Sequence, residues 1–232
     1  MTNQSNPSAT SVAALSQLLQ NLELGTGECN MALSSLSDDT IFFPPLPTQL
    51  TICPNDVGDR CHIKGPNLHL LNVFDDDDFL AQLLLNEALV LHRLTQQPHP
   101  NIVHFYGVQV AQGRITGLVL EKHQRNLKQH VELGLPISHP VIFMRALASA
   151  VFYMHSLGLA HNDLTPENVM VSDDGMPVVI DFGLSAPFGT RLTSMGTPEW
   201  VRDIDAHIYS NKGHDFYALE KLFTWLKERF MD

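Results

Sequence analysis

A chain of 232 residues can bury one sizeable core, or two small lobes around a shared cleft, and its 44% hydrophobic content is that of a globular protein. The formal charge of −11, from 25 acidic and 14 basic residues, argues against a nucleic-acid-binding surface, which needs a stripe of Lys and Arg. Because the chain has neither an apolar run of membrane-spanning length nor a signal-peptide pattern in residues 1–10, we expect an intracellular protein, cytoplasmic or alternatively nuclear, that binds no membrane.

The first 40 residues form the least regular part of the sequence. They are rich in Ser, Asn, Thr and Gln, which predicts a flexible N-terminal arm over residues 1–40. Four leucines, at positions 15, 18, 19 and 22, share one face at helical spacing, so the alternative is a short helix that docks on a partner through residues 11–24. The proline-rich segment 42–47 would stop such a helix, and folding is expected to begin there.

The next part, residues 41–123, predicts short strands and one helix. Short β-type pieces at 49–53 and 60–63 are separated by a turn at Pro54-Asn55-Asp56. The acidic run Asp75 to Asp78 is expected to cap a helix over 79–94, because acidic groups favour the first turn, and His99-Pro100-Asn101 ends that helix. Strands are then predicted at 102–110 and 114–121.

From residue 124 onward the pattern is mainly helical. A long helix is predicted over 141–157, stopped by Gly158, and a final helix over 217–230. Between them, short apolar runs at 169–171 and 177–180 flank the turn sequence Asp173-Asp174-Gly175, which predicts a hairpin.

The segment with the most chemical information lies on either side of this hairpin. It reads His161-Asn162-Asp163-Leu164-Thr165-Pro166-Glu167-Asn168, and Asp181-Phe182-Gly183 begins 13 residues after Asn168. Two carboxylates and a carboxamide at this spacing suit a reaction that needs a base near a hydroxyl and oxygen ligands for Mg²⁺. Each residue alone could merely cap or close a turn. Their joint order and spacing favour a catalytic site.

With these motifs, the chain resembles a eukaryotic-type protein kinase, most closely the serine/threonine branch, from about Arg60 to about Leu226. The segments that carry the resemblance, besides the two above, are Cys61-His62-Ile63-Lys64, Asn86-Glu87-Ala88, His99 to Gly107, Val119-Leu120-Glu121, Gly196-Thr197-Pro198-Glu199-Trp200 and Asp215 to Leu219. The resemblance implies an α+β, two-lobed fold. Residues 41–123 would form a small β-rich N-lobe with one regulatory helix, and residues 124–232 a truncated, mainly helical C-lobe.

The resemblance also implies roles for individual residues. Asp163 would be the catalytic base, and Lys64, steadied by Glu87, would hold the α- and β-phosphates of ATP. Asn168 and Asp181 would hold Mg²⁺. The adenine would lie against a gatekeeper and hinge formed by Leu120, Glu121 and His123. The aspartate at 215 would brace the catalytic loop, and the partner would be a protein substrate that the sequence does not identify.

The sequence departs from the family's pattern in five places. The expected glycine-rich phosphate loop is missing, because residues 49–60 contain a single glycine, Gly58. Asn162 replaces the arginine that would pair with a phosphorylated activation loop, and Thr165 replaces a lysine near the transferred phosphate. The Ala-Pro-Glu motif that ends the family's activation segment is not recognisable, and by spacing it would fall on Arg202-Asp203-Ile204. The chain also ends at Asp232, without the later C-lobe helices.

Three functions therefore stay open at this point. The first is a compact serine/threonine protein kinase that transfers the γ-phosphoryl group of Mg·ATP. The second is a pseudokinase, a nucleotide-binding or scaffolding module. The third is a small-molecule phosphotransferase of the aminoglycoside or choline kinase type. The retained Lys64, Asp163, Asn168 and Asp181 favour the first over the second, and Phe182-Gly183-Leu184 favours the first over the third.

Overall fold

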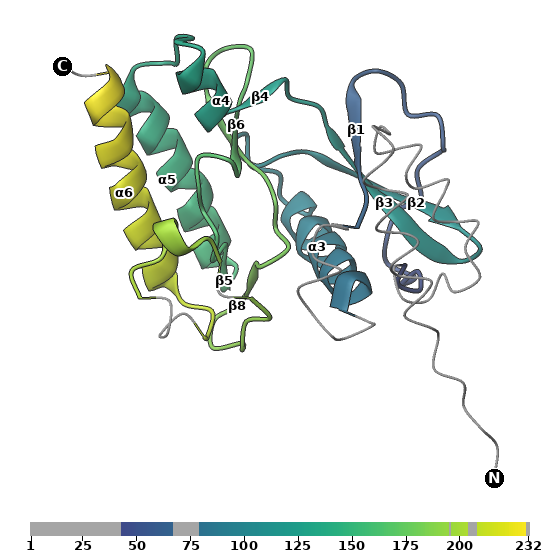
Figure 1. The fold of residues 1–232 in the computed structure, drawn as a ribbon. Helices are drawn as coiled ribbons and strands as arrows, with labels where there is room; N and C mark the ends of the chain where they lie inside the picture. The colour runs from purple at the N-terminus through teal and green to yellow at the C-terminus, as the bar shows by residue number, and fades with distance from the viewer. Residues whose placement is uncertain (1–42, 67–78, 195, 204–207, 231–232) are drawn as a thin grey trace, which may run out of the picture.

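The computed structural model describes residues 43–66, 79–194, 196–203 and 208–230. The predicted arm over 1–40, the docking helix within 11–24 and the acidic cap at 75–78 lie outside these described residues. Figure 1 shows two groups of elements, with strands β1, β2 and β3 and helix α3 on one side and helices α4, α5 and α6 on the other. The α+β, two-lobed arrangement is thus confirmed.

The first group is built on an antiparallel sheet of strand order β1-β3-β2. Its strands are β1 (Cys61–Lys64), β2 (Phe105–Ala111) and β3 (Arg114–Glu121). The prediction for β3 is confirmed, but β2 begins three residues later than expected. The reason is that Ile102 and Val103 pair with Val179 of the other lobe, so this stretch joins the two groups instead of extending the strand.

The segment before β1 lies along the edge of the sheet that β2 forms, on the side away from β1. The strand predicted at 49–53 is reduced to one parallel bridge between Ile52 and Val108, flanked by a hydrogen bond from Cys53 N to the Val108 carbonyl. A glycine is required where this segment crosses β2, because a Cβ at Gly107 would lie 2.3 Å from the Thr51 carbonyl oxygen. No hairpin precedes β1 within residues 43–60, in keeping with the missing glycine loop.

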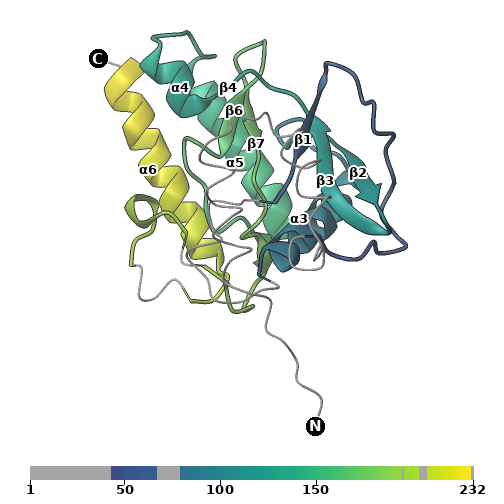
Figure 2. The same ribbon diagram turned by 45° about the vertical axis from the view of Figure 1, so that its right-hand side comes forward.

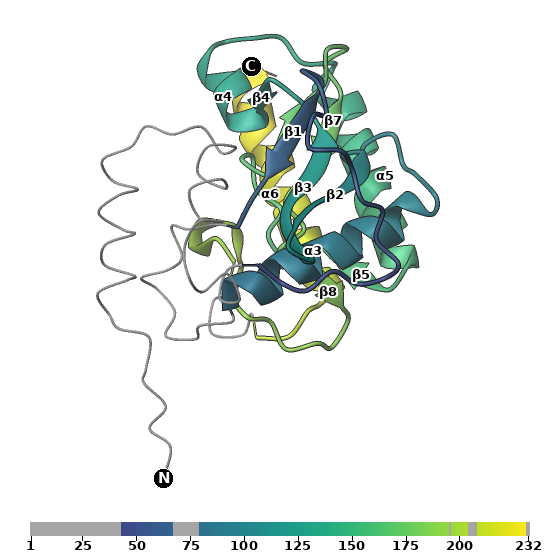
Figure 3. The same cartoon turned by 90° about the vertical axis from the view of Figure 1, so that its right-hand side faces the viewer.

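Helix α3 (Phe79–Thr95) packs against the sheet, as the apolar spacing predicts. Its buried residues include Leu84, Ala88 and Leu91, which recur at helical period, and Glu87 is buried on the same helix. Figure 3 shows α3 running across the lower ends of the strands. Glu87 on this helix contacts Lys64, the last residue of β1.

The second group consists of two long helices and a short one. Helices α5 (Pro140–Ser156) and α6 (Lys212–Phe230) lie side by side (Figure 2). The predicted α5 is confirmed to within one residue at each end, whereas α6 begins five residues earlier than predicted, because the Asn211 side chain accepts a hydrogen bond from Gly213 N and caps the helix. The short helix α4 (Leu127–Glu132), closed by a capping box from Asn126 to Gln129, was not predicted.

Short strands between these helices position the loops that carry the predicted catalytic residues. Strands β4 (Arg125–Asn126), β6 (Val169–Val171) and β7 (Pro177–Val179) form one sheet, and β5 (Leu159–Ala160) pairs with β8 (Ala186–Pro187). The predicted β6–β7 hairpin is confirmed, with Val169 opposite Val179. A 3-10 turn (Pro198–Trp200) follows β8. In the described ranges, no helix has the length and apolarity needed to cross a membrane.

Candidate active site

The backbone of the loop between β5 and β6 is held in place by a buried carboxylate. Asp215, near the start of α6, accepts hydrogen bonds from the backbone N–H of His161 at 2.9 Å and of Asn162 at 2.9 Å. It also bonds Nε2 of His155 at 2.7 Å, and its side chain has no solvent exposure. These bonds are the brace that the resemblance predicts, and they determine where Asp163, the next residue, projects.

Asp163 and Asn168 contact one another at the two ends of the loop. The Asn168 carboxamide donates from Nδ2 to the Asp163 backbone carbonyl at 2.8 Å and to its carboxylate Oδ2 at 3.2 Å. Since the nitrogen faces Asp163, the carboxamide oxygen is the atom that Asn168 can offer to a cation. The backbone N–H of Thr197 donates to Asp163 Oδ1 at 2.8 Å, a contact that the sequence did not predict.

Lys64 contacts two carboxylates, one from its own lobe and one from the other. Its ammonium lies 2.7 Å from both oxygens of Glu87 on α3 and 3.0 Å from Oδ1 of Asp181. Glu87 Oε1 also accepts the backbone N–H of Phe182 at 3.1 Å. The side chains of Lys64 and Asp181 are 26% and 46% exposed, so a ligand can reach both, whereas Glu87 is buried.

The charges in this group follow from burial and from the pairing itself. Burial favours neutral Lys64, but the carboxylates of Glu87 and Asp181 outweigh it and raise the pKa of the ammonium above its ordinary value. Burial raises the pKa of Glu87, although Lys64 opposes that effect. Burial would also raise the pKa of Asp181, but the adjacent ammonium lowers it overall. Lys64 and Asp181 are therefore both charged at neutral pH.

Asp181 begins a segment with an unusual backbone. Its φ of 61° lies in the left-handed region, and its Oδ1 accepts the backbone N–H of Gly183 at 3.3 Å. Phe182 is completely buried, and its ring lies 5.4 Å from that of His161. The apolar ring thus anchors the segment in the core while Asp181 remains accessible.

Four of the predicted residues line one hollow between the lobes, with a volume of about 240 Å³. They are Lys64, Glu87, Asp163 and Asp181. Asn168 contacts Asp163 but is not among the lining residues. In the described ranges, no group of three or more His, Cys, Asp or Glu could hold a metal. The donors that Asn168 and Asp181 provide, one carboxamide and one carboxylate oxygen, suit Mg²⁺, which takes few protein ligands.

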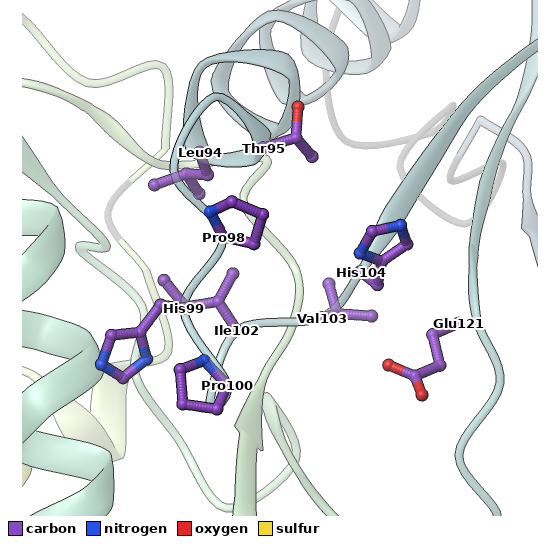
Figure 4. A pocket seen from close by; sticks show the side chains of 9 residues that line it. All are labelled: Leu94, Thr95, Pro98, His99, Pro100, Ile102, Val103, His104 and Glu121. Carbon is purple, nitrogen blue, oxygen red and sulfur yellow. The ribbon is translucent and has the colours of Figure 1, made fainter.

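The three predicted hinge residues lie away from this hollow. Leu120 is buried and pairs with His62 across the sheet. The Glu121 side chain lines a second hollow of about 360 Å³, on the same side as His104 and across from Pro98 and Pro100 (Figure 4). Its carboxylate lies 3.6 Å from Nε2 of His123. The contact of these three residues with adenine stays a prediction.

Two carboxamides that the sequence did not identify as site residues contact the segment after Asp181. Asn86, directly before Glu87, donates to the carbonyls of Gly183 and Ser185, and Asn162 donates to that of Leu184. In the sequence, Asn162 stands out only because it replaces an arginine. Nothing in the sequence near Asn86 signals its partners, which lie almost a hundred residues further along the chain.

Comparison with known proteins identifies the family. The model of the protein kinase domain matches residues 71–219. Over 147 residues the chain is 34% identical to mouse dual specificity testis-specific protein kinase 1, which covers 57% of this chain and 23% of the relative. It is 35% identical over 143 residues to a putative CBL-interacting protein kinase 13 of Oryza sativa subsp. japonica (59% and 27%), and 29% identical over 158 residues to human receptor-interacting serine/threonine-protein kinase 1 (66% and 22%).

These matches cover about a quarter of the length of each relative. The matched family region contains Glu87, Asp163, Asn168 and Asp181 but begins after Lys64, so the assignment of Lys64 rests on its contacts. The family model covers well over half of the sequence. The chain belongs to the protein kinase family.

Proposed function

We propose that this chain transfers the γ-phosphoryl group of Mg·ATP to a Ser or Thr hydroxyl of a protein substrate. The observation that carries the proposal is the set of contacts around Lys64, whose ammonium touches Glu87 and Asp181 at once. A charged lysine held between a buried and an accessible carboxylate is arranged to receive phosphate oxygens. Asp163 lines the same hollow.

The proposed reaction gives each residue a separate task. Asp163 accepts the proton of the substrate hydroxyl while that oxygen forms its bond to the γ-phosphorus, and the bond from this phosphorus to the β,γ-bridging oxygen breaks to release ADP. Lys64 holds the α- and β-phosphates, and Glu87 fixes the position of Lys64. Asn168 and Asp181 would hold Mg²⁺, which when bound would supply positive charge to the phosphate oxygens.

A second candidate is a pseudokinase that binds nucleotide, or only partner proteins, without transferring phosphate. The contact that favours it is the hydrogen bond from Thr197 N to Asp163 Oδ1, which occupies one oxygen of the proposed base. Thr165 also favours it, because this residue is buried and bonds Asn168 N instead of supplying a cation. Both features predict weak transfer rather than none, because Asp163 still lines the hollow and, among the residues that the structure describes, its Oδ2 is contacted only by Asn168 Nδ2, at 3.2 Å.

Transfer of labelled phosphate from ATP to a mixed Ser/Thr and Tyr peptide library separates these candidates. Incorporation into Ser or Thr peptides supports the proposal, and incorporation into Tyr peptides alone contradicts its substrate class. Nucleotide binding measured in parallel, with no incorporation into any peptide, favours the pseudokinase.

A further inference from the structure

Three consecutive backbone carbonyls, beginning with that of Gly183, accept hydrogen bonds from side-chain carboxamides. Asn86 Nδ2 donates to the carbonyl of Gly183 at 3.1 Å and to that of Ser185 at 3.1 Å. The carbonyl between them, that of Leu184, accepts from Asn162 Nδ2 at 3.0 Å. Two asparagines from distant parts of the chain therefore hold one short stretch of backbone.

Each asparagine is the direct neighbour of a residue of the proposed site. Asn86 precedes Glu87, which itself accepts the N–H of Phe182. Asn162 precedes Asp163, and its own backbone N–H is bonded to Asp215. The held carbonyls begin two residues after Asp181. Any displacement of this stretch would therefore change the relative positions of all three functional carboxylates.

The backbone conformation at both ends of this arrangement needs support. Asp181 and Asn162 have φ values of 61° and 67°, in a region that residues other than glycine rarely adopt. Asn is among the residues that tolerate this region best, and Asn162 is buried, with 2% of its surface exposed. Such conformations persist where the surroundings fix them, which is what the carboxamide bonds do.

The chemistry of the contacts explains why carboxamides occupy these positions. A carboxamide nitrogen carries two N–H donors, so Asn86 can serve two carbonyls. Asn162 Nδ2 also contacts the Ala160 carbonyl and Ser210 Oγ, and its Oδ1 lies 3.0 Å from Nδ1 of His214. A carboxylate in either place would face carbonyl oxygens and repel them. These hydrogen bonds join neutral groups, so they do not depend on phosphorylation of the chain.

We infer that Asn86 and Asn162 are positioning residues that hold Asp181 in place for the metal by fixing the carbonyls of residues 183–185. The inference deepens the proposed function and rests on it for the identity of the metal. We refer to these two side chains and the three carbonyls as the carboxamide clamp. The clamp links helix α3 and the catalytic loop to Asp181 through neutral hydrogen bonds.

The test uses variants that remove the donors while keeping the fold. Asn86→Ala deletes the donors on a helix that tolerates alanine well. Asn86→Asp keeps the shape but presents oxygens to the carbonyls, and Asn162→Gly keeps access to the positive φ. Gln82→Ala is the matched control, because it removes an exposed amide one turn earlier on α3. Asn86→Gln restores a carboxamide and should recover part of any loss.

Two measurements are made on each variant of the full chain. Amide hydrogen exchange of a peptide covering residues 181–185 should be faster in the three clamp variants and unchanged in Gln82→Ala, while a peptide from α5 stays as protected as in the wild type. The Mg²⁺ concentration needed for half-maximal binding of a fluorescent ATP analogue should rise about 10- to 100-fold in the clamp variants.

The outcomes separate the clamp from the proposed function. Exchange and Mg²⁺ dependence equal to those of Gln82→Ala in all three clamp variants would overturn the inference. Faster exchange at 181–185 in the clamp variants supports the clamp even where the wild type transfers no phosphate, and in that case only the proposed function fails.

Discussion

The buried carboxylate of Asp215 offers a direct test of how the catalytic loop is held. It accepts two backbone N–H groups, those of His161 and Asn162, and bonds His155 Nε2. Each buried donor left without a partner costs about 1–3 kcal/mol, so Asp215→Ala should lose roughly 3–9 kcal/mol of the free energy of unfolding. That range reaches the total stability of many domains, about 5–15 kcal/mol. Asp215→Ala is therefore expected to fold poorly.

Asp215→Asn is the more informative variant, because it keeps the shape and one acceptor oxygen. The bonds to His155 and His161 share Oδ2, so an asparagine oxygen at that position keeps both, and only the bond from Asn162 N to Oδ1 is lost. One buried donor without a partner predicts a decrease of about 1–3 kcal/mol. At roughly 2–4 °C per kcal/mol for a chain of this size, even the lower figure corresponds to a fall of about 2–4 °C in melting temperature.

The assay is urea unfolding together with thermal melting, and the control is Glu220→Gln, which removes an exposed carboxylate from the same helix. This control should stay within about 0.5 kcal/mol of the wild type. If Asp215→Asn unfolds at the same urea concentration as Glu220→Gln, the bond from Asn162 N to Asp215 does not support the loop and the reasoning is wrong.

Four further predictions concern ligands and pH. Mg·ATP at a hundred times its dissociation constant should stabilise the fold by about 2.7 kcal/mol, roughly 5–10 °C, and the absence of any shift in a thermal melt would contradict nucleotide binding. Asp181→Asn should abolish the Mg²⁺ dependence of nucleotide binding and leave the melting temperature of the free protein near that of the wild type, which titration with and without Mg²⁺ can check. On acidification, Glu87 should take up a proton before Asp181 does, because the pKa of Glu87 is raised above 4.5 and that of Asp181 is lowered below 3.8. Nucleotide binding should therefore weaken as the pH falls through the pKa of Glu87. The variant Glu87→Gln should lack this pH dependence. Transfer should be unaffected by phosphatase treatment, because Asn162 carries no positive charge to pair with a phosphate on a hydroxyl such as that of Thr190, Thr193 or Ser194. A large drop in rate would refute this.

Local sequence patterns predicted the elements that have a clear period or turn signal. Strand β3 and the hairpin of β6 and β7 lie where the alternation and the Asp-Asp-Gly turn place them. Helix α4 could not be predicted because six residues are too few to show a helical period. The start of α6 was misplaced because its cap, Asn211, precedes a glycine that has low helix propensity.

The candidate site could be predicted only as far as its motif residues. Lys64, Glu87, Asp163 and Asp181 were found from spacing and resemblance, and the structure brings them to one hollow. The partners of Asn86 are separated from it by 97 and 99 residues, so their contact depends on how α3 packs on the rest of the fold. Local propensity carries no information about such a contact.

The central claim is that Asp163 is the base of a phosphoryl transfer. The most direct measurement is the steady-state rate of phosphate transfer from labelled ATP to the best peptide of a mixed library, for the wild type and for Asp163→Asn. We expect a wild-type rate below the roughly 1–100 per second of typical kinases, because the glycine loop is missing and Thr165 supplies no cation. Asp163→Asn should lower that rate by about 10²- to 10⁴-fold while nucleotide binding stays unchanged. Equal rates for the two proteins would contradict the account.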